Sequence, residues 1–391
     1  MTRTADVAII GGGVIGASSA YRLAKAGKKV VLCEKEDFAS GATGSCDQMV
    51  ILQSKKPGFH LKIALDSAEM FKSLPQELGC DIEYFQKGGM ITIENEMEMQ
   101  VMKKVVDEQK ETGLEVDIIS RAEAAKRQRG LGEHLLGCTY SPADGEVNPF
   151  KLNLAFARGA KALGAELLID CPVTGFITEG GKVKGIKTVK GEVHAETVIL
   201  AAGAWSPIVG KELGINVPIK PRRGQIMITE PVAPYVNGDI LSAQYIVAKH
   251  HPETLVNAKS RAIQLGVGLS LTQSAKGDIL IGATREFVDY DKRNTREAIR
   301  EVLKNATRIV PGLKDINIIR IMSGFRPYTP DGLPLIGYVD KLPGLFMACG
   351  HEGDGIALSA ITGRIVSELI CEGKAYMDIS PLDPNRFEMF A

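Results

Sequence analysis

Short apolar runs that end in glycine occur at the start of the chain, near its middle and close to its end. The first is the most complete: residues 5–10 are apolar except for Asp6 and lead into residues 11–16, Gly-Gly-Gly-Val-Ile-Gly. Residues 14–26 then show the spacing of an amphipathic helix, and residues 29–33 form a second apolar run, closed by Glu34. This order predicts a strand, a helix and a parallel strand in one βαβ unit.

The same strand-to-glycine pattern returns at residues 197–203 and 344–350, and the periodic run at 356–372 predicts a late helix. Parallel strands buried on both faces read as continuous apolar runs of this kind. The chain between these units carries shorter alternating and periodic runs. They predict strands at residues 88–93, 165–169, 174–188 (a hairpin turned at Gly180 and Gly181), 224–229, 245–248, 278–283 and 316–321, and helices at 63–74 (stopped by Pro75), 94–113, 150–163 and 295–308.

These runs predict an α/β plus α+β protein, in which a Rossmann-like nucleotide-binding domain is interrupted by a mostly antiparallel sheet domain. The chain of 391 residues is too long for one simple core. We assign residues 1–86, 144–216 and 322–391 to the nucleotide-binding domain, and residues 87–143 and 217–321 to a substrate-binding domain.

The glycines of the first turn each suit a dinucleotide site. Gly11 permits the tight turn out of the strand, Gly13 lets the backbone approach a pyrophosphate, and Gly16 lets the helix pack closely. The helix N-terminus directs its N–H groups at the phosphates. Glu34, at the end of the second strand, can accept hydrogen bonds from the ribose hydroxyls. The alternative is a glycine-rich turn in an ordinary α/β protein.

The formal net charge is zero, and nucleic-acid binding needs a basic surplus, so we expect no nucleic-acid partner. No apolar run has membrane-spanning length, and the first strand begins too close to Met1 to leave room for a signal peptide. The seven cysteines form no C-x-x-C pair, which excludes the common zinc and iron–sulfur motifs. We expect no metal and a reducing, cytoplasmic location.

Several segments together resemble the FAD-dependent amine oxidoreductases grouped with D-amino-acid oxidase, glycine oxidase and the sarcosine oxidase β subunit. They are the turn at 11–16 with Glu34, the strand at 197–205, residues 324–337 (Gly-Phe-Arg-Pro-Tyr-Thr-Pro-Asp-Gly-Leu-Pro-Leu-Ile-Gly) and the turn at 350–355 (Gly-His-Glu-Gly-Asp-Gly). Residues 53–58, Gln-Ser-Lys-Lys-Pro-Gly, and the turn at 350–355 are most similar to β subunits of opine, hydrogen cyanide synthase and D-proline or D-hydroxyproline dehydrogenases.

The resemblance implies FAD, in a D-amino-acid-oxidase-like fold. The glycines that end the later strands agree, because a tricyclic cofactor along a domain interface needs contacts from several segments. Monomeric sarcosine oxidase links its flavin to a late cysteine, but in a local motif unlike that of Cys349, and Cys46 is a candidate only in principle, so we expect non-covalent FAD. The expected cofactor-binding residues are Gly11, Gly13, Val14, Ile15, Gly16, Glu34, Lys35, Ser40, Thr43, Gly44, Ser45, Val173, Ala202, Gly203, Trp205, Gly350, Gly353, Asp354, Gly355 and Ile356.

Arg326, in the sequence Gly-Phe-Arg-Pro, matches the arginine with which family members hold the substrate's α-carboxylate. A planar guanidinium pairs with a carboxylate through two parallel hydrogen bonds; the alternative is a structural salt bridge. Tyr245, expected in a strand, and His351 are further catalytic candidates, with a sheet tyrosine and a turn-capping histidine as the alternatives. Glycine oxidase has an arginine where this chain has Gly353, which argues against a small, glycine-like substrate.

We expect oxidation of the C–N bond of an amino acid or secondary amino acid (a D-amino acid, a proline-type compound, an N-alkyl glycine or an opine) to the imine, by hydride transfer to flavin N5. The alternatives are an FAD dehydrogenase of a 2-hydroxy acid or glycerol phosphate, and a flavin-bearing electron-transfer subunit that is inert without its partners. Electron transfer to an iron–sulfur centre would need electron-accepting subunits in a hetero-oligomer. Lys55 and Lys56 are either a surface pair or serve a partner or a second flavin.

Overall fold

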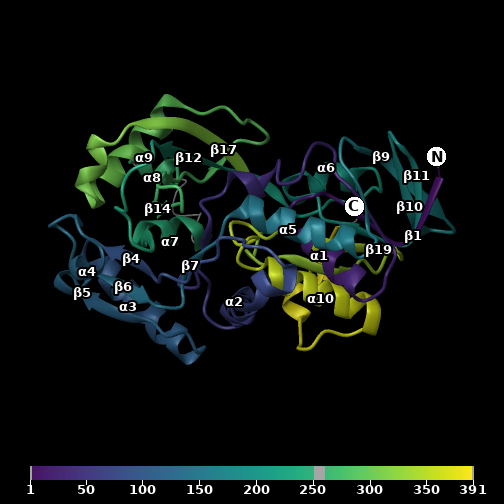
Figure 1. Cartoon of the computed structure of the whole chain (residues 1–391), viewed down its shortest axis with the longest axis horizontal. Coiled ribbons are helices and arrows are strands. Elements are labelled where there is room, and N and C mark those ends of the chain that lie inside the picture. The colour runs from purple at the N-terminus through teal and green to yellow at the C-terminus, as the bar shows by residue number, and fades with distance from the viewer. Residues whose placement is uncertain (1, 251–259, 390–391) are drawn as a thin grey trace.

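The computed structural model describes residues 2–250 and 260–389 and shows two lobes side by side (Figure 1). One lobe contains a mainly parallel sheet with helices packed on it, and the other contains a mainly antiparallel sheet. The colours of Figure 1 show that the chain passes between the lobes repeatedly. The expected fold class is therefore confirmed.

The parallel lobe is organised around β1. The carboxyl ends of neighbouring strands coincide, because Ile10 at the end of β1 pairs with Leu200 on one side and Cys33 on the other. The turns that follow these strands therefore meet at one edge. In the described part of the chain the strand order is β18-β19-β11-β1-β2-β8, with the β9–β10 hairpin attached at β11. The bounds are β1 (Thr2–Ile10), β2 (Val30–Cys33), β8 (Glu166–Leu168), β9 (Val173–Glu179), β10 (Lys182–Thr188), β11 (Gly191–Leu200), β18 (Leu335–Tyr338) and β19 (Leu345–Cys349).

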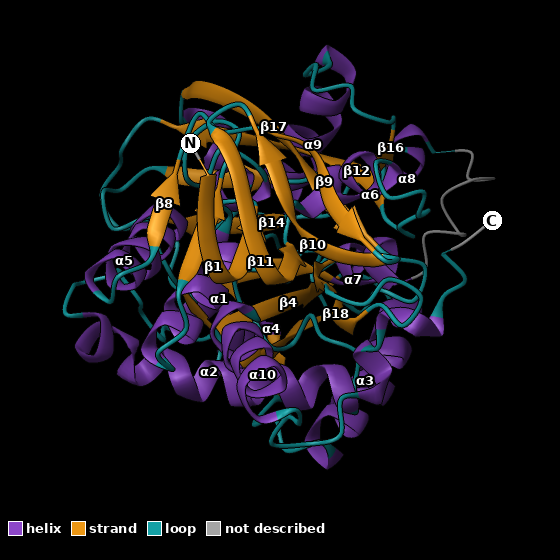
Figure 2. Cartoon of the chain, turned by 90° about the vertical axis from the view of Figure 1, so that its right-hand side faces the viewer, coloured by secondary structure: helices purple, strands orange, loops and turns teal. Residues whose placement is uncertain are grey.

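Helices cover one face of this sheet (Figure 2). Helix α1 (Val14–Lys25) packs against α5 (Pro149–Ala162) and α10 (Ser359–Glu372), and α10 packs against α2 (Phe59–Leu78). The contact between α1 and α10 is close, since a Cβ added to Gly363 would lie 2.2 Å from Ser18 Oγ. The β9–β10 hairpin and residues 215–219 contribute the apolar side chains on the other face.

The second sheet has the order β16-β12-β15-β14-β13-β4-β6-β5 among the described residues, and β17 also pairs with β12. This last pairing is long and places Arg222 directly opposite Arg326. The strands are β4 (Gly89–Ile93), β5 (Asp117–Ser120), β6 (Gly137–Ser141), β12 (Lys220–Thr229), β13 (Asp239–Ser242), β14 (Ser270–Gln273), β15 (Ile279–Gly282), β16 (Glu286–Phe287) and β17 (Ile318–Tyr328).

The remaining elements are short or lie around the second sheet. Strands β3 (Met49–Val50) and β7 (Gly145–Glu146) form a small ladder of their own. The other helices are α3 (Glu96–Glu111), α4 (Arg121–Arg127), α6 (Ser206–Lys211), α7 (Ala243–His250), α8 (Arg261–Gln264) and α9 (Arg296–Ile309), with 3₁₀ turns at Ala42–Ser45, Gly203–Trp205, Pro311–Asp315, Ser380–Leu382 and Pro384–Arg386.

Three local predictions are wrong. Tyr245 lies in helix α7 and not in a strand, because a short apolar run fits either element and here it buries Tyr245 and Ile246 from a helix. Pro75 lies inside α2, which continues to a left-handed C-cap at Gly79. Helix α10 begins at Ser359 and not at residue 356, because residues 355–358 form a separate turn.

The sheets draw their strands from the segments that the proposed domain division assigns to them. The one difference is that β17 spans the proposed boundary between residues 321 and 322. The division stays a proposal, with that boundary inside a strand. Among the residues that the structure describes, no helix combines the length and the apolarity needed to cross a membrane.

Candidate active site

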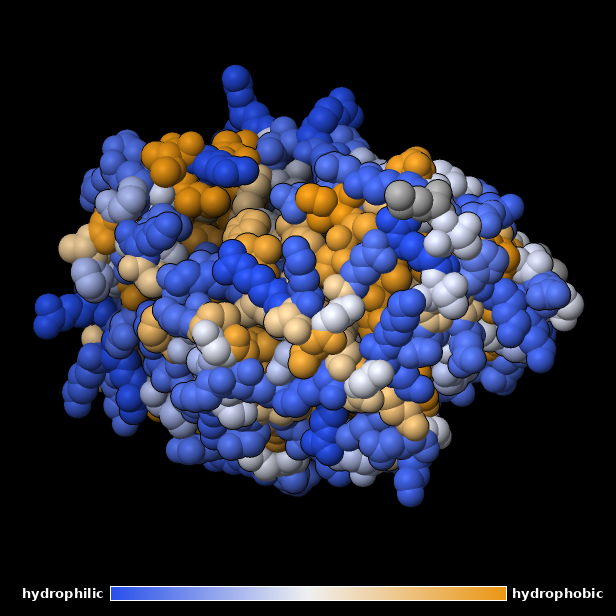
Figure 3. Space-filling model, turned by 45° about the vertical axis from the view of Figure 1, so that its right-hand side comes forward, coloured by the Kyte–Doolittle hydropathy of each residue, from blue (hydrophilic) through white to orange (hydrophobic). Residues whose placement is uncertain are grey.

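A cavity of about 410 Å³ lies where the two lobes meet. The parallel lobe contributes the turns after β1, β2, β11 and β19, and the second sheet contributes β12 and β17. Figure 3 shows apolar side chains gathered in a hollow on the surface of the molecule. The cavity is therefore long, apolar for much of its length, and lined by both lobes.

The glycine turn forms one end of this cavity and is packed too tightly for other residues. Gly11 has φ +113°, and a Cβ there would lie 2.5 Å from the carbonyl oxygen of Ala201. A Cβ on Gly16 would lie 2.0 Å from the carbonyl oxygen of Gly11, so Gly16 sets the approach of α1 to the strand. A Cβ on Gly13 would meet only the hydroxyl of Thr43, at 3.3 Å. The backbone at Gly13 is thus open to a ligand.

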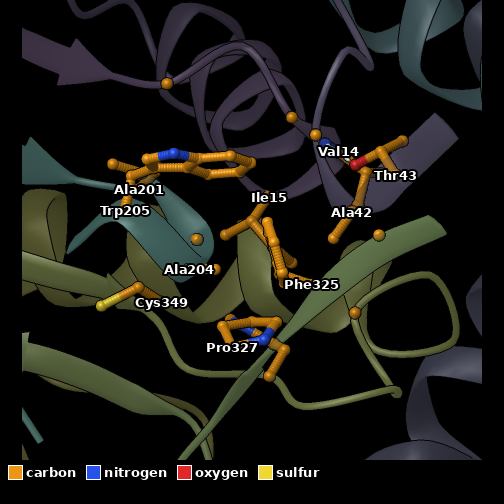
Figure 4. Close-up of a pocket in the computed structure, with 18 of the residues that line it drawn as sticks. Val14, Ile15, Ala42, Thr43, Ala201, Ala204, Trp205, Phe325, Pro327 and Cys349 are labelled. Atoms are coloured by element: carbon orange, nitrogen blue, oxygen red, sulfur yellow. Dashed lines mark hydrogen bonds between the residues drawn. The ribbon is translucent and has the colours of Figure 1, made fainter. Parts of the chain in front are cut away.

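Glu34 and Thr43 hold this turn through side-chain hydrogen bonds. Glu34 lines the cavity and accepts hydrogen bonds from the N–H groups of Gly12 (2.6 Å) and Glu36 (2.9 Å). The Thr43 hydroxyl accepts a hydrogen bond from the Val14 N–H at 3.0 Å, as the dashed line in Figure 4 shows. These hydrogen bonds fix the turn at the N-terminus of α1, whose first residues line the cavity, and a helix N-terminus is a suitable site for a pyrophosphate.

Flat and apolar walls extend the cavity from this turn. Figure 4 shows Trp205 and Cys349 on one side of the space and Val14 with Thr43 on the other, with Ile15 between them. Lys35 lies with its Nζ 4.5 Å from the centre of the Trp205 ring, a cation–π contact at the cavity edge.

Most of the expected site residues line this one cavity. Gly16 and Gly44 lie behind its surface: a Cβ on Gly44 would lie 2.4 Å from the carbonyl oxygen of Ala39, so both glycines serve close backbone packing. Asp354 faces a buried ion cluster instead. The expected site residues that line the large cavity are Gly11, Gly13, Val14, Ile15, Glu34, Lys35, Ser40, Thr43, Ser45, Val173, Ala202, Gly203, Trp205, Tyr245, Arg326, Gly350, His351, Gly353, Gly355 and Ile356.

Arg326 projects from β17 into the cavity with most of its donors available. Its Nη1 donates a hydrogen bond to the carbonyl oxygen of Thr284 at 2.9 Å. In the described part of the chain, Nε and Nη2 have no hydrogen-bond partner. Gly224 on the neighbouring strand makes the room, because a Cβ there would lie 2.5 Å from Arg326 Nη1. The geometry leaves an edge of the guanidinium for a ligand, and no salt bridge occupies it.

Tyr245 lines the cavity from α7 and lies against a second arginine. The guanidinium carbon of Arg285 is 3.7 Å from the centre of the Tyr245 ring. Arg285 is 1% exposed, and none of its three side-chain nitrogens has a hydrogen-bond partner among the residues that the structure describes. Burial raises the pKa of Tyr245, so its hydroxyl stays protonated at neutral pH.

His351 is fully enclosed beside the cavity. Its Nε2 lies 3.0 Å from the Thr362 hydroxyl of α10. Burial lowers the pKa of His351 to about 3, so the ring is neutral. The contact joins the turn at 350–355 to α10, which is the role of a structural histidine.

Sequence reasoning missed the charges around this turn. Asp354 Oδ1 accepts from Lys249 Nζ (2.7 Å) and lies 2.8 Å from Lys55 Nζ, and His60 Nε2 lies 3.4 Å from Oδ2. Lys55 is therefore buried and ion-paired, whereas Lys56 is exposed and donates to the carbonyl oxygen of Asp331. The idea that Lys55 and Lys56 form a surface pair is wrong.

Neither of the two candidate flavin anchors, Cys46 and Cys349, is a reactive thiolate. Burial raises the pKa of Cys46 and of Cys349 to about 12, so both thiols are protonated at neutral pH. A protonated thiol is a poor nucleophile. Both side chains line the cavity as small apolar groups.

The two-lobed fold and the cavity at the glycine turn are those of a dinucleotide-binding protein. The chain belongs to the FAD dependent oxidoreductase (DAO) family, whose sequence model matches residues 6–369. It is 29% identical to the hydrogen cyanide synthase subunit HcnC of Pseudomonas aeruginosa, over 99% of this chain and 97% of that protein. It is 30% identical to glycine oxidase of Geobacillus kaustophilus, over 99% of this chain and 98% of that protein.

Solved structures show the same relationship. L-proline dehydrogenase from P. horikoshii superposes with a TM-score of 0.89 at 30% identity, covering 99% of this chain and 98% of that one. Glycine oxidase from Geobacillus kaustophilus gives a TM-score of 0.87 at 28% identity, covering 99% of this chain and all of the other. The protein is an FAD-dependent oxidoreductase, and the open backbone at Gly13, the N-terminus of α1 and the long apolar cavity fit that cofactor.

Proposed function

We propose that this protein oxidises the C–N bond of an amino acid or secondary amino acid to the imine. The observation that carries the proposal is the free edge of the Arg326 guanidinium inside the cavity. A guanidinium edge binds a carboxylate through two parallel hydrogen bonds and so fixes its orientation. Candidate substrates are D-amino acids, proline-type compounds, N-alkyl glycines and opines.

Residues at one end of the cavity bind the cofactor, and residues at the other end bind the substrate. The glycine turn, Glu34 and the N-terminus of α1 hold the nucleotide half of FAD, and Arg326 with Tyr245 holds the substrate. FAD, when bound there, would supply the two-electron acceptor for the substrate's hydride. The apolar walls exclude water and keep the reacting carbon oriented. We propose that the FAD is non-covalent, since the thiols of Cys46 and Cys349 are protonated.

The names of the relatives support an amino-acid substrate. Glycine oxidase and L-proline dehydrogenase are named for amino acids, and HcnC is named as a subunit. We therefore propose electron-accepting partner subunits as the natural setting of the chain. The seven cysteines are free thiols, which supports a reducing, cytoplasmic location.

Anaerobic reduction of the bound flavin tests the proposal. The purified protein is mixed with D- and L-amino acids, N-methyl amino acids, proline derivatives, opines, 2-hydroxy acids and glycerol phosphate, and flavin absorbance is followed. We expect bleaching with at least one amine that carries an α-carboxylate. Bleaching only with a hydroxy acid or glycerol phosphate would replace the proposal with that alternative. No bleaching by any compound would favour an electron-transfer subunit.

A further inference from the structure

Glu352 separates two cavities. It lines the large cavity beside Arg326, and it also lines a second cavity of about 30 Å³. The second cavity lies on the far side of the turn at 350–355. Its other lining residues are Lys56, His60, Lys249, Tyr328, Pro330, Asp331 and Gly332.

The carboxylate of Glu352 is held in a defined position. Its Oε2 accepts a hydrogen bond from the Gly353 N–H at 2.5 Å, and its Oε1 lies 3.4 Å from Arg222 Nη1. The Glu352 N–H donates to the carbonyl oxygen of Pro327 at 3.1 Å, next to Arg326 in the chain. The residue has φ +49°, a left-handed conformation that costs a non-glycine residue energy. The contacts with Gly353, Arg222 and Pro327 hold the residue in this conformation, in which it lines both cavities.

Cations surround this carboxylate from every packed element. Burial alone would raise the pKa of Glu352, but the positive charges outweigh burial and lower it, so the group is ionised at neutral pH. The charges are Arg222 on β12, Arg285 after β15, Arg326 on β17 and Lys249 on α7. Tyr328, His60, Lys56 and Asp331 face it from the second cavity, and Asp354 lies two residues along the same turn.

The proposed reaction must remove a proton from the substrate's nitrogen. At neutral pH a free amino acid carries an ammonium group, whose nitrogen has no lone pair with which to form the C=N bond. Oxidation of the ammonium form releases one hydride from carbon to FAD and one proton from nitrogen, and leaves the iminium. Because the cavity walls are largely apolar, this proton needs an acceptor among the lining residues and a route out.

Four carboxylates line the large cavity, and their positions separate their roles. Glu34 and Glu36 belong to the turn after β2, at the nucleotide end. Asp47 and Glu352 belong to segments near Arg326, and of these only Glu352 also faces the second cavity. The surrounding cations disfavour a bound ammonium as well, because like charges lower its pKa. The same cations also lower the pKa of Glu352, so they favour loss of the proton from nitrogen and its onward release rather than its retention on the carboxylate.

We infer that Glu352 accepts the proton of the substrate's ammonium group and releases it through the second cavity, while Arg326 holds the carboxylate. Together the two side chains recognise an amino-acid zwitterion from opposite ends. This inference rests on the proposed function, and it assigns to this chain a catalytic residue for it.

The pH dependence of anaerobic flavin reduction tests the inference, with a substrate found in the panel above. We expect Glu352→Gln to slow reduction about 10²-fold near pH 7, the usual size of one general base. The ratio of wild-type to variant rates should fall towards 1 near about pH 10, where the free amine predominates. A variant with the wild-type rate at both pH values would overturn the inference, as would a shift seen in Asp47→Asn and not in Glu352→Gln.

Binding of a ligand that has a carboxylate but no amine distinguishes proton transfer by Glu352 from a structural effect of the substitution on the site. Benzoate, followed by the change in flavin absorbance, should bind Glu352→Gln at least as tightly as wild type, because the variant removes a negative charge close to Arg326, and should bind Arg326→Ala weakly. Weak binding of benzoate to Glu352→Gln would show a structural role instead. If no amine bleaches the wild-type flavin, the proposed function itself is wrong. If an amine bleaches it but Glu352→Gln behaves like wild type, only the role of Glu352 is wrong.

If Glu352→Gln does not retain FAD, a second variant at the same position tests the inference. Glu352→Asp keeps the charge and withdraws the carboxylate by one methylene. We expect it to slow flavin reduction about tenfold or more near pH 7 and to leave it unchanged near about pH 10. Equal slowing at both pH values, or no slowing at either, would contradict proton transfer through this side chain.

Discussion

At the scale of single residues, the position of Arg326 depends on a glycine across the sheet. Gly224 provides the volume that the guanidinium occupies, and the carbonyl oxygen of Thr284 fixes one of its nitrogens. The other donors are left for a ligand. The ability of an arginine at position 326 to bind a ligand therefore depends on the residues packed around it.

Arg326→Ala should weaken substrate binding while FAD stays bound. Loss of a bidentate charged pair costs about 2–4 kcal/mol, so kcat/KM should fall about 30- to 1,000-fold. Steady-state kinetics and the ratio of flavin to protein absorbance measure the two effects. Arg320→Ala, at an exposed position of the same strand, is the matched control and should leave kcat/KM within about twofold. Unchanged kinetics in Arg326→Ala would remove the carboxylate site.

Arg285 is a buried cation without a hydrogen-bond partner in residues 2–250 and 260–389, and such a group destabilises a fold. The contact with the Tyr245 ring compensates only part of the cost. We expect Arg285→Met to raise the free energy of unfolding by about 1–2 kcal/mol, because an apolar side chain of similar volume needs no partner. Thermal denaturation measures the change, with Arg320→Met as the exposed control. A loss of stability would mean that the guanidinium is required by the fold.

At the scale of elements, the strand–turn–helix unit at the N-terminus is the most constrained part of the cofactor site. Gly11 and Gly16 face each other across the turn, so neither accepts a side chain. The carboxylate of Glu34 and the hydroxyl of Thr43 accept hydrogen bonds from N–H groups at this turn, which joins β1 to α1, and so hold it in place. The N-terminus of α1 is positioned by packing and by these two side chains together.

Gly16→Ala should push α1 away from the turn and abolish FAD retention. The added methyl group would lie 2.0 Å from a backbone oxygen, which cannot move without the strand. Overpacking of this kind costs about 1–3 kcal/mol and displaces the N–H groups that bind phosphate. The flavin content of the purified variant is the measurement. Gly175→Ala in β9, where an added Cβ meets nothing within 4 Å, should retain FAD.

At the scale of the whole molecule, the cavity exists only because both lobes contribute to it. The parallel lobe supplies the turns after its strands, and the second sheet supplies β12 and β17. A ligand that spans this interface binds the folded protein and not the unfolded chain. Its binding energy therefore adds to the stability of the fold.

Removal of FAD should lower the thermal midpoint. At a free FAD concentration of 100 times the dissociation constant, linkage contributes about 2.7 kcal/mol. The apoprotein should therefore unfold a few degrees lower, and added FAD should restore the midpoint in a concentration-dependent way. A midpoint independent of FAD would contradict a site built between the lobes.

Asp239 should make stability depend on pH. Burial, together with the nearby charges of Glu146 and Asp144, raises its pKa well above the ordinary value. The folded state therefore binds the proton more tightly, and the contribution to stability declines as pH rises through the folded-state pKa. Asp239→Asn should be more stable than wild type near neutral pH, and this difference should shrink in acid. The exposed Asp340→Asn is the control, and a difference independent of pH would contradict the assignment.

The sequence alone determined the elements whose causes are local. The βαβ unit at residues 5–34 could be predicted because strand periodicity, the glycine turn and the helix follow rules that act within about 30 residues. The expectation of FAD and the choice of Arg326 rested instead on the resemblance of several segments to a known family.

Only the tertiary structure decided what depends on segments far apart in the chain. In the tertiary structure the run at Tyr245 is a helix, Lys55 is buried against Asp354, and Arg285 has no hydrogen-bond partner within the described part of the chain. The tertiary structure also placed Glu352 between two cavities. The physical reason is that burial and charge pairing are set by whichever elements pack together, and no local pattern records which residues will meet.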